Sequence, residues 1–365
     1  MHYVTGEAPH GPRTLMVCRM ITRSPNLLQS IASTRDWQAQ LSDAIRDPRA
    51  LLARLGLDES WLPGAEAGHA LFETRVPEAY LARMRHGDPH DPLLRQVLPL
   101  ASETDAVSGF IDDPLEEAAH TPRRGLIHKY HGRALLIGSP ACAINCRYCF
   151  RRHFPYAENS PSRAQWQETL DYLRADTSIH EAILSGGDPL ACGDKRLAWL
   201  VEQLDGIPNL VRLRIHTRLP VVIPDRVDGA LLGWLSATRL QTVMVLHINH
   251  ANEIDASVVD ACARLRAAGA TLLNQSVLLR GVNDSIDTLA ELSERLFAAG
   301  VLPYYLHVLD PVAGAAHFDV PDDEAIRLVD ALRQRLAGFL LPRLVREVPG
   351  ERSKTPLISM QGPHS

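Results

Sequence analysis

Residues 134–149 read ALLIGSPACAINCRYC, an apolar run followed at once by three cysteines. The run Ala134–Gly138 is short and apolar and is followed by a serine and a proline, which is typical of a buried strand. Cys142, Cys146 and Cys149 then fall within eight residues. In folds built on parallel strands the chemistry sits at the carboxyl ends of the strands, so this loop is the first candidate for a functional site.

Five more apolar runs follow the first, and each of the six is succeeded by a helical pattern. We expect these further strands at Glu181–Ser185, Val211–Thr217, Thr242–Asn249, Thr271–Leu279 and Pro303–Leu309. Six strand–helix units in a row predict an α/β fold with a parallel sheet. Because six is short of the eight units of a complete TIM barrel, we favour a partial (β/α)6 TIM-like barrel over a doubly wound sheet.

The helical stretches are expected from their caps and apolar spacing. Ser160-Pro161 would start the helix after the cysteine loop, with Trp166, Leu170 and Leu173 on its buried face. Leu289, Leu292 and Leu296 repeat that spacing later in the chain.

The chain divides by texture into four parts. We expect a disordered leader in which Met16 or Met20 could be the true start, a mostly helical region without visible chemistry, a core barrel, and a C-terminal segment. Their expected ranges are 1–23, 24–125, 126–338 and 339–365. Within the helical region the patterns cover Asp36–Leu57, broken at Pro48, and about Pro77–Met84, and residues 88–125 are expected to be mainly loop.

Composition excludes several classes of protein. The 365 residues are 45% hydrophobic, which suffices for a large core, and no apolar run reaches the ~20 residues of a membrane span. A net charge of −5 and 5% aromatic residues argue against a nucleic-acid partner. Six cysteines, three of them clustered, indicate a reduced, cytoplasmic protein with one thiol-rich site, and we interpret Cys18, Cys192 and Cys262 as bystanders.

Three thiolates are an incomplete ligand set for the usual metal sites. Structural zinc and a fully ligated [4Fe–4S] cluster both take four protein ligands. Three would leave one iron of a cluster open, as a chemically active cluster requires. The alternatives are a zinc site completed by a distant residue such as His153, or three buried cysteines that are merely adjacent.

Polar residues gather at other predicted strand ends. Ser185-Gly186-Gly187-Asp188 ends the second strand with a turn whose glycines allow close approach of a ligand, although such a pair is more often only a turn. His216 to Arg218, His247 and Asp310 end later strands, and Gln275 lies inside the fifth. Lys354 lies in a Pro/Gly-containing loop and is the only lysine after Lys195, and arginine cannot replace a lysine that forms a Schiff base.

These motifs together resemble a known family. The matching stretches, in order, are IHKYHGRALL, CAINCRYCFRRHF, LSGGDPL, HTRLPVVIP, HINHANEID, LLNQSVLLRGVND, PYYLHVLDPVAGAAHF and PGERSKTPL, between about residues 127 and 357. The chain is similar to the lysine 2,3-aminomutase family of radical S-adenosylmethionine (SAM) enzymes. CRYCFRRHFPYAEN and HVLDPVAGAAHF look most like the branch that makes (R)-β-lysine for elongation factor P.

The resemblance implies three cofactors and a role for each candidate residue. A [4Fe–4S] cluster would bind Cys142, Cys146 and Cys149. SAM would contact Ser185, Gly186, Gly187, Asp188, His247 and Gln275. Pyridoxal 5′-phosphate (PLP) would form its Schiff base with Lys354 and be held by Lys129, Tyr130 and Arg133. The substrate would be bound by Arg151 at its carboxylate and by Asp310 and Glu347 at its ε-ammonium.

The implied activity is an isomerase reaction that converts L-α-lysine to β-lysine, with an external one-electron reductant. The product would serve elongation factor P and its lysyl ligase, with no nucleic-acid or membrane partner and with a homo-oligomer left open. The alternatives are a 2,3-aminomutase acting on arginine or glutamate, and an iron–sulfur or zinc protein without catalysis.

The sequence also departs from the family's free-lysine mutases. Glu347 stands where they carry aspartate, so the charge persists with a longer reach. Ser285 replaces a zinc-ligand cysteine, and no cysteine follows Cys262. We therefore expect the zinc-binding extension to be missing and any oligomer to assemble differently.

Overall fold

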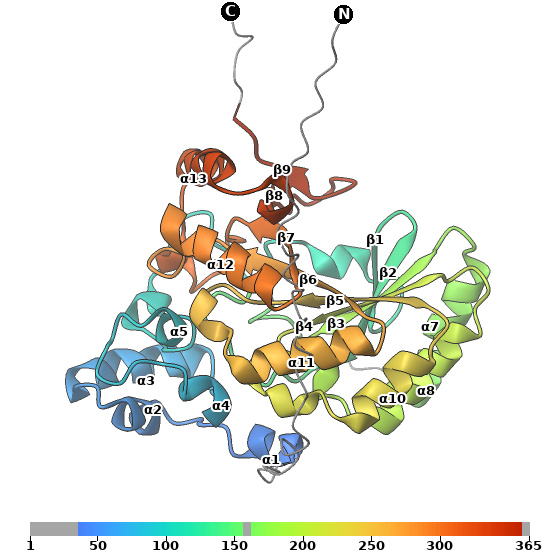
Figure 1. Cartoon of the computed structure of the whole chain (residues 1–365), viewed down its shortest axis with the longest axis horizontal. Helices are drawn as coiled ribbons and strands as arrows, with labels where there is room; N and C mark the ends of the chain where they lie inside the picture. The colour runs from blue at the N-terminus through green and yellow to red at the C-terminus, as the bar shows by residue number, and fades with distance from the viewer. Residues whose placement is uncertain (1–35, 156–161, 360–365) are drawn as a thin grey trace, which may run out of the picture. The chain divides into compact units, whose positions relative to one another are not determined.

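A single parallel sheet organises the chain. The computed structural model describes residues 36–155 and 162–359, and in this part nine strands form one sheet in chain order (Figure 1). Strands β2 to β8 run parallel to one another, and the edge strands β1 and β9 pair antiparallel with β2 and β8. The strands are β1 Leu126–Tyr130, β2 Arg133–Ser139, β3 Glu181–Gly186, β4 Arg212–Thr217, β5 Gln241–Leu246, β6 Thr271–Val277, β7 Leu302–His307, β8 Arg343–Arg346 and β9 Thr355–Pro356.

The order of the strands decides between the two predicted architectures. A doubly wound sheet reverses its strand order at a switch point, and here each strand pairs with the next one in sequence. The partial barrel is confirmed, with an open sheet in which β1 and β9 are the edges, and the doubly wound alternative is wrong.

All six predicted strands are present as β2 to β7, and three strands were not predicted. In β1 only the first two residues are buried, and Lys129 and Tyr130 line the pocket described below. Strands β8 and β9 have four and two residues, too few for a periodic signal. The predicted strand 242–249 ends earlier, at Leu246.

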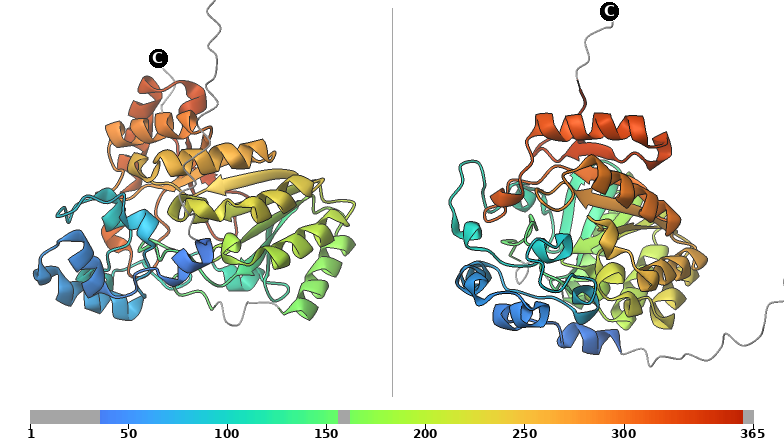
Figure 2. Two further views of the ribbon diagram at one scale, coloured as in Figure 1. Left: turned by 60° about the horizontal axis from the view of Figure 1, so that its bottom comes forward. Right: turned by 60° about the vertical axis from the view of Figure 1, so that its left-hand side comes forward.

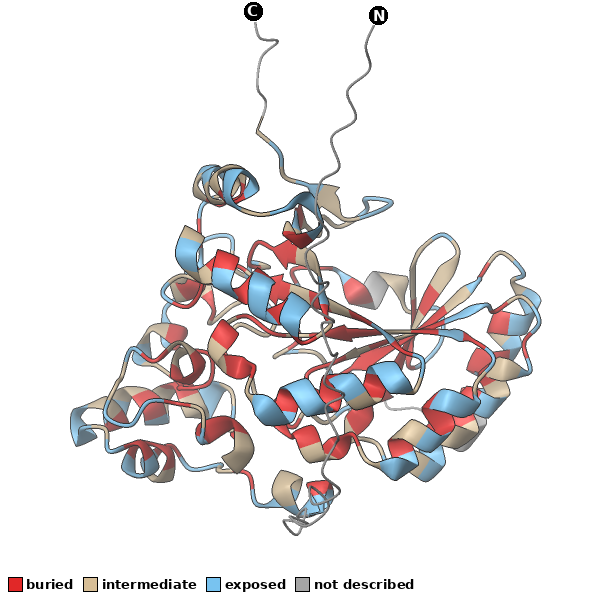
Figure 3. Cartoon of the chain, in the orientation of Figure 1, coloured by how far each residue is buried: buried red, intermediate tan, exposed pale blue. Residues whose placement is uncertain are grey.

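Six longer helices connect the parallel strands, one per connection. They are α7 Arg163–Ala175, α8 Asp194–Asp205, α10 Gly229–Ala237, α11 Ala256–Ala267, α12 Ile286–Ala298 and α13 Asp322–Arg335. Figure 3 shows their buried faces turned toward the sheet. Trp166, Leu170 and Leu173 are buried as predicted. Ser160-Pro161 lies outside the described residues, and the cap of α7 is instead Ser162, whose hydroxyl accepts from the backbone N–H of Gln165.

The region before the barrel is built from short helices, grouped on one side of it (Figure 2). Pro48 is the first residue of its helix and separates it from the preceding one, as predicted. Residues 88–125, predicted mainly as loop, also contain three short helical turns. The elements are α1 Trp37–Ser42, α2 Pro48–Leu55, η1 Glu59–Trp61, α3 Leu62–Leu71, α4 Glu78–Leu81, α5 Pro92–Arg95, η2 Ala101–Thr104 and η3 Glu117–His120.

Further short helical turns lie in the connections between the strands. These turns are η4 Pro189–Ala191, α9 Leu219–Val222, η5 Pro224–Arg226, η6 Ala251–Glu253, η7 Ala316–Phe318 and η8 Gly338–Leu340. Cys262 is buried on α11, and Cys192 donates to the Gly138 carbonyl at 3.0 Å. The expected leader 1–23, with Cys18, Met16 and Met20, lies outside the described residues. Within the described chain, no helix combines the length and apolarity needed to cross a membrane.

Candidate active site

One large pocket gathers the candidate residues. It has a volume of about 930 Å³ and is lined by side chains of all nine strands, β1 to β9, by the loops after them and by residues of α13. All sixteen residues singled out from the sequence line it. They are Lys129, Tyr130, Arg133, Cys142, Cys146, Cys149, Arg151, Ser185, Gly186, Gly187, Asp188, His247, Gln275, Asp310, Glu347 and Lys354.

The cysteine loop follows β2 and is clamped by the region before the barrel. Arg147 is fully buried and donates through Nε to Glu103 Oε1 at 2.8 Å. Its backbone N–H donates to the Gln96 carbonyl at 2.9 Å, and Asn145 N–H donates to the Arg75 carbonyl at 3.1 Å. The helical region, for which the sequence predicted no chemistry, therefore fixes the backbone that carries the three thiols.

The three cysteines are partly buried on one loop. Burial, and then the negative charge of Cys146, raises the pKa of Cys149 to about 11. The pKa of Cys142 is also raised, first by burial and then by Cys149. Thiolates that repel one another in this way are stabilised when metal binds them. In the described ranges, no three His, Cys, Asp or Glu side chains are placed so that they could bind one and the same metal ion.

The Gly-Gly turn ends β3 against the cysteine loop. Gly186 has φ = 118°, and a Cβ on Gly187 would lie 2.6 Å from the Ala141 carbonyl oxygen, so the turn needs glycine at both positions. Asp188 is buried, and its carboxylate accepts from Thr217 Oγ1 at 2.7 Å and from the Arg218 N–H at 2.8 Å. The carboxylate thus ties the ends of β3 and β4 together.

Polar side chains with unused hydrogen-bonding atoms line the pocket on the next strands. His216 Nε2, His247 Nε2, His307 Nε2 and Gln275 Oε1 are buried and have no hydrogen-bond partner within the described structure. Burial, and then the charge of Arg218, lowers the pKa of His247 to about 4, so this imidazole is neutral at pH 7. Buried polar atoms are nearly always paired, so these four atoms suit a polar ligand in the pocket.

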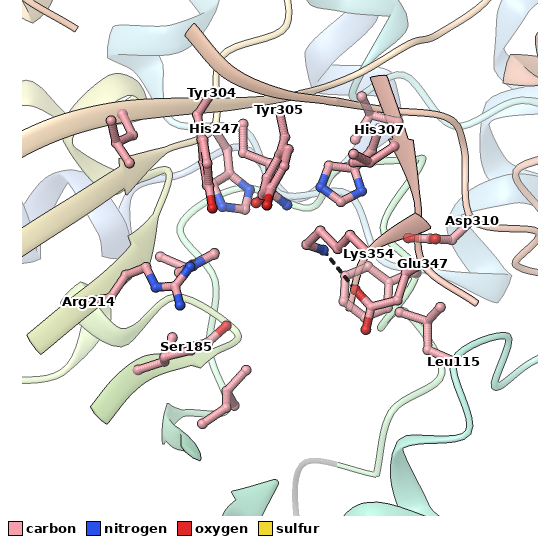
Figure 4. A pocket seen from close by; sticks show the side chains of 18 of the residues that line it. Leu115, Ser185, Arg214, His247, Tyr304, Tyr305, His307, Asp310, Glu347 and Lys354 are labelled. Carbon is pink, nitrogen blue, oxygen red and sulfur yellow. Dashed lines mark hydrogen bonds and ion pairs between the residues drawn. The ribbon is translucent and has the colours of Figure 1, made fainter. Parts of the chain in front are cut away.

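Lys354 lies at the other end of the pocket, and Figure 4 shows it facing Glu347. Its Nζ is 2.8 Å from Glu347 Oε2, and Lys129 Nζ is 3.2 Å from Oε1 of the same carboxylate. The two cations lower the pKa of Glu347 to about 2, against the opposing effect of its burial. Burial and the charge of Glu347 raise the pKa of Tyr130, and Arg133 lies over the Tyr130 ring at 4.5 Å.

Asp310 and Arg151 differ sharply in their surroundings. Burial, and then the negative charge of Glu347, raises the pKa of Asp310 to about 7. Arg151 is buried, and its Nε and Nη2 donate to the two oxygens of Glu117 at 2.8 and 2.7 Å. Its Nη1 donates to Ser185 Oγ at 3.1 Å. In this structure Glu117 therefore occupies the two donors with which Arg151 could bind both oxygens of a substrate carboxylate.

Comparison with known proteins identifies the family. The pattern of the radical SAM superfamily matches residues 136–293. L-lysine 2,3-aminomutase of Escherichia coli (strain K12) is 53% identical over 89% of this chain and 95% of its own. The protein of the same name from Haemophilus influenzae is 49% identical over 89% and 96%, and that from Clostridium subterminale is 33% identical over 93% and 82%. The chain belongs to the L-lysine 2,3-aminomutase family of radical SAM enzymes.

Membership of this family implies an isomerase that works with a [4Fe–4S] cluster, SAM and PLP. The residues that line the pocket are chemically suited to all three groups. It holds three thiols on one loop, unpartnered imidazole and amide atoms on or next to the strands, and a lysine, Lys354, that shares a carboxylate with a second cation, Lys129. The chain has only three lysines, and two of them line this pocket.

Several pocket residues of the aminomutase fold were missed from the sequence. Glu117 lies in a region predicted as loop, and no spacing rule pairs it with an arginine 34 residues later. His307 falls within a predicted strand, and its placement on the pocket side could have been inferred from alternation. Arg218 was placed at the rim from the sequence, but nothing there indicated its partners, described below.

Proposed function

We propose that this chain converts L-α-lysine to β-lysine by moving the amino group from C2 to C3, with PLP bound to Lys354. The supporting observation is that the three cysteines and Lys354 line one pocket of about 930 Å³ in a chain 53% identical to a protein named L-lysine 2,3-aminomutase. This volume lies toward the upper end of the range of about 300–1,000 Å³ that is typical of small-molecule sites.

The bound groups supply reactivity that no side chain has. SAM held at the cluster would supply hydrogen-abstracting radical chemistry on one-electron reduction, and PLP would supply a conjugated ring that stabilises an unpaired electron. The protein's own contribution is to bind, orient and exclude water.

Glu347 lies beside the cofactor lysine. Its carboxylate, with a pKa of about 2, accepts a hydrogen bond from Lys354 Nζ at 2.8 Å and so orients that nitrogen. Lys129, paired with the same carboxylate, provides a cation for the phosphate of PLP, together with Arg133. Loss of the Lys354 charge on binding PLP would leave Glu347 with Lys129 as its remaining partner.

The two ends of lysine need groups of opposite charge. Arg151 is the cation for the substrate carboxylate, which would reach it beside or in place of Glu117. Asp310, close enough to Glu347 for its pKa to be raised, is the anion for the ε-ammonium. This acidic pair favours a cationic substrate, lysine or arginine, over glutamate.

The assignment of the product and its use rests on the difference in sequence identity to two of the relatives. The identity is 53% to the Escherichia coli protein and 33% to the clostridial one. We infer that the product is (R)-β-lysine, made in the cytoplasm for a lysyl ligase that modifies elongation factor P.

The test is product formation under strict anaerobiosis. Reconstituted enzyme is incubated with L-lysine, SAM, PLP and dithionite, and the products are separated by chiral chromatography, with arginine and glutamate in parallel. We expect β-lysine, mainly the R form, and none from Lys354→Ala. Lys195→Ala, which removes an exposed lysine outside the pocket, is the matched control and should keep full activity. Absence of β-lysine with an intact cluster would refute the proposal.

A further inference from the structure

Arg218 makes direct contact with a predicted cluster ligand. It follows β4 immediately, and the residue is only 6% exposed. Its Nη1 lies 2.7 Å from Cys146 Sγ and 2.8 Å from the Tyr148 hydroxyl oxygen. A buried cation therefore donates to one of the three sulfurs that would bind iron.

The guanidinium is held from its far side. Its Nη2 donates to Glu253 Oε2 at 2.8 Å, to Gln96 Oε1 at 2.7 Å and to the Tyr80 hydroxyl at 3.0 Å. Glu253 is fully buried, and its other oxygen accepts from Gln96 Nε2 and the Asn249 N–H. These contacts fix the guanidinium with its Nη1 toward Cys146 and its Nη2 toward Glu253.

One donor of Arg218 remains unused. Its Nε is buried and has no hydrogen-bond partner in the described part of the chain, and the residue lines the pocket. This N–H is therefore available to a group that binds in the pocket.

We propose that Arg218 is a positioning residue that sets the reduction potential of the cluster. Reduction adds one electron, from a low-potential donor such as dithionite, and makes the cluster more negative by one charge. Hydrogen bonds to cluster sulfurs and nearby positive charge stabilise that reduced form and raise its potential. The proposal rests on the cluster that family membership implies, and it is independent of the lysine and PLP chemistry.

The test is a redox titration of the cluster followed by electron paramagnetic resonance, without lysine or PLP. Arg218→Gln alone would leave Glu253 as an unpaired buried charge, so the main variant is Arg218→Gln with Glu253→Gln. We expect the ratio of reduced to oxidised cluster at a fixed potential to fall about tenfold, which equals about 59 mV for one electron. Arg218→Lys, which keeps the charge with fewer donors, should shift the ratio less.

Arg83→Met is the matched control. Arg83 has a side chain only 7% exposed and donates to the backbone carbonyls of Glu253 and Val221. It therefore contacts Glu253, the residue that also binds Arg218, and its hydrogen bonds in the described chain do not involve a cysteine. Its ratio should stay within about twofold of the wild type. An unchanged ratio in the double variant, with full iron content, would overturn the proposal. If the double variant does not fold, an Arg218→Lys ratio equal to that of Arg83→Met would overturn it.

Because lysine is absent, the outcome separates this proposal from the one on activity. A shifted potential in the double variant, together with a wild-type enzyme that makes no β-lysine, would support the role of Arg218 and refute the proposed function. An unshifted potential in the double variant, together with a wild-type enzyme that makes β-lysine, would do the reverse.

Discussion

At the scale of single residues, charged side chains in the pocket are paired with side chains of opposite charge. Glu347 lies between Lys129 and Lys354, and Glu117 neutralises Arg151. The carboxylate of Glu347 contacts both lysines at once. The charge expected from the sequence is present, and the structure adds that its partners here are the two lysines.

Asp310 should make substrate binding depend on pH. Its pKa is raised to about 7, and only its ionised form attracts an ammonium group, so KM for lysine should rise up to tenfold per pH unit below 7. Asp310→Asn should raise KM by roughly 10–100-fold and flatten this dependence. Steady-state kinetics between pH 6 and 8 measure both effects.

Asp319→Asn is the control for that measurement, because it makes the same change on an exposed carboxylate. It should leave KM and its pH dependence unchanged. Retention of the wild-type pH profile by Asp310→Asn would show that another group binds the ammonium.

Gly187→Ala tests the turn between β3 and the cysteine loop. The added Cβ would lie 2.6 Å from the Ala141 carbonyl oxygen, so backbone must move, and we expect a loss of about 1–3 kcal/mol in unfolding free energy and weaker SAM binding. Urea unfolding and equilibrium dialysis measure these. Gly233→Ala in α10, where a Cβ meets nothing within 4 Å, should be neutral or slightly stabilising. Equal effects from both changes would rule out the steric explanation.

At the scale of elements, the cysteine loop depends on helices that precede it by 40 to 80 residues in the chain. Arg147 and Arg152 both pair with Glu103 of η2, and all three side chains are at most 1% exposed. The loop between β2 and α7 has no regular structure to hold it at the cysteines. The N-terminal region therefore supports the site without supplying a predicted ligand.

Glu103→Ala should weaken that support. Removing the carboxylate leaves two buried arginines without their anion, and we expect a loss of about 3–5 kcal/mol with lower iron retention after reconstitution. Chemical denaturation and iron analysis measure these. Glu78→Ala breaks the Arg54 pair, whose side chains are 46–54% exposed, and should change stability by less than about 1 kcal/mol. Full iron retention by Glu103→Ala would mean that the loop holds itself.

Sequence periodicity worked where one element buries a continuous face. The six strands β2 to β7 were predicted because each is an apolar run followed by a helical repeat. Strands β8 and β9 could not be, since pairing with a distant strand, not local pattern, makes them strands. The cap of α7 was misplaced by two residues because Ser160 and Ser162 carry equivalent side chains for capping.

At the scale of the whole molecule, the open barrel accounts for why a site spread from residue 129 to residue 354 is one site. The parallel strands β2 to β8 bring the loops after them to one edge of the sheet, and the antiparallel edge strands β1 and β9 add their own residues, so motifs far apart in sequence line one pocket. The meeting of the loops after β2 to β7 followed from the sequence. The pairings Arg151–Glu117, Arg147–Glu103 and Arg218–Cys146 did not, because each joins segments whose separation only folding sets.

The central claim is that SAM and lysine meet in this single pocket. The most direct measurement uses lysine deuterated at C3, with catalytic turnover under anaerobic, reducing conditions and mass spectrometry of the recovered SAM. The account predicts deuterium on the 5′ carbon of SAM as β-lysine accumulates. SAM that is cleaved but never acquires deuterium from lysine would contradict it.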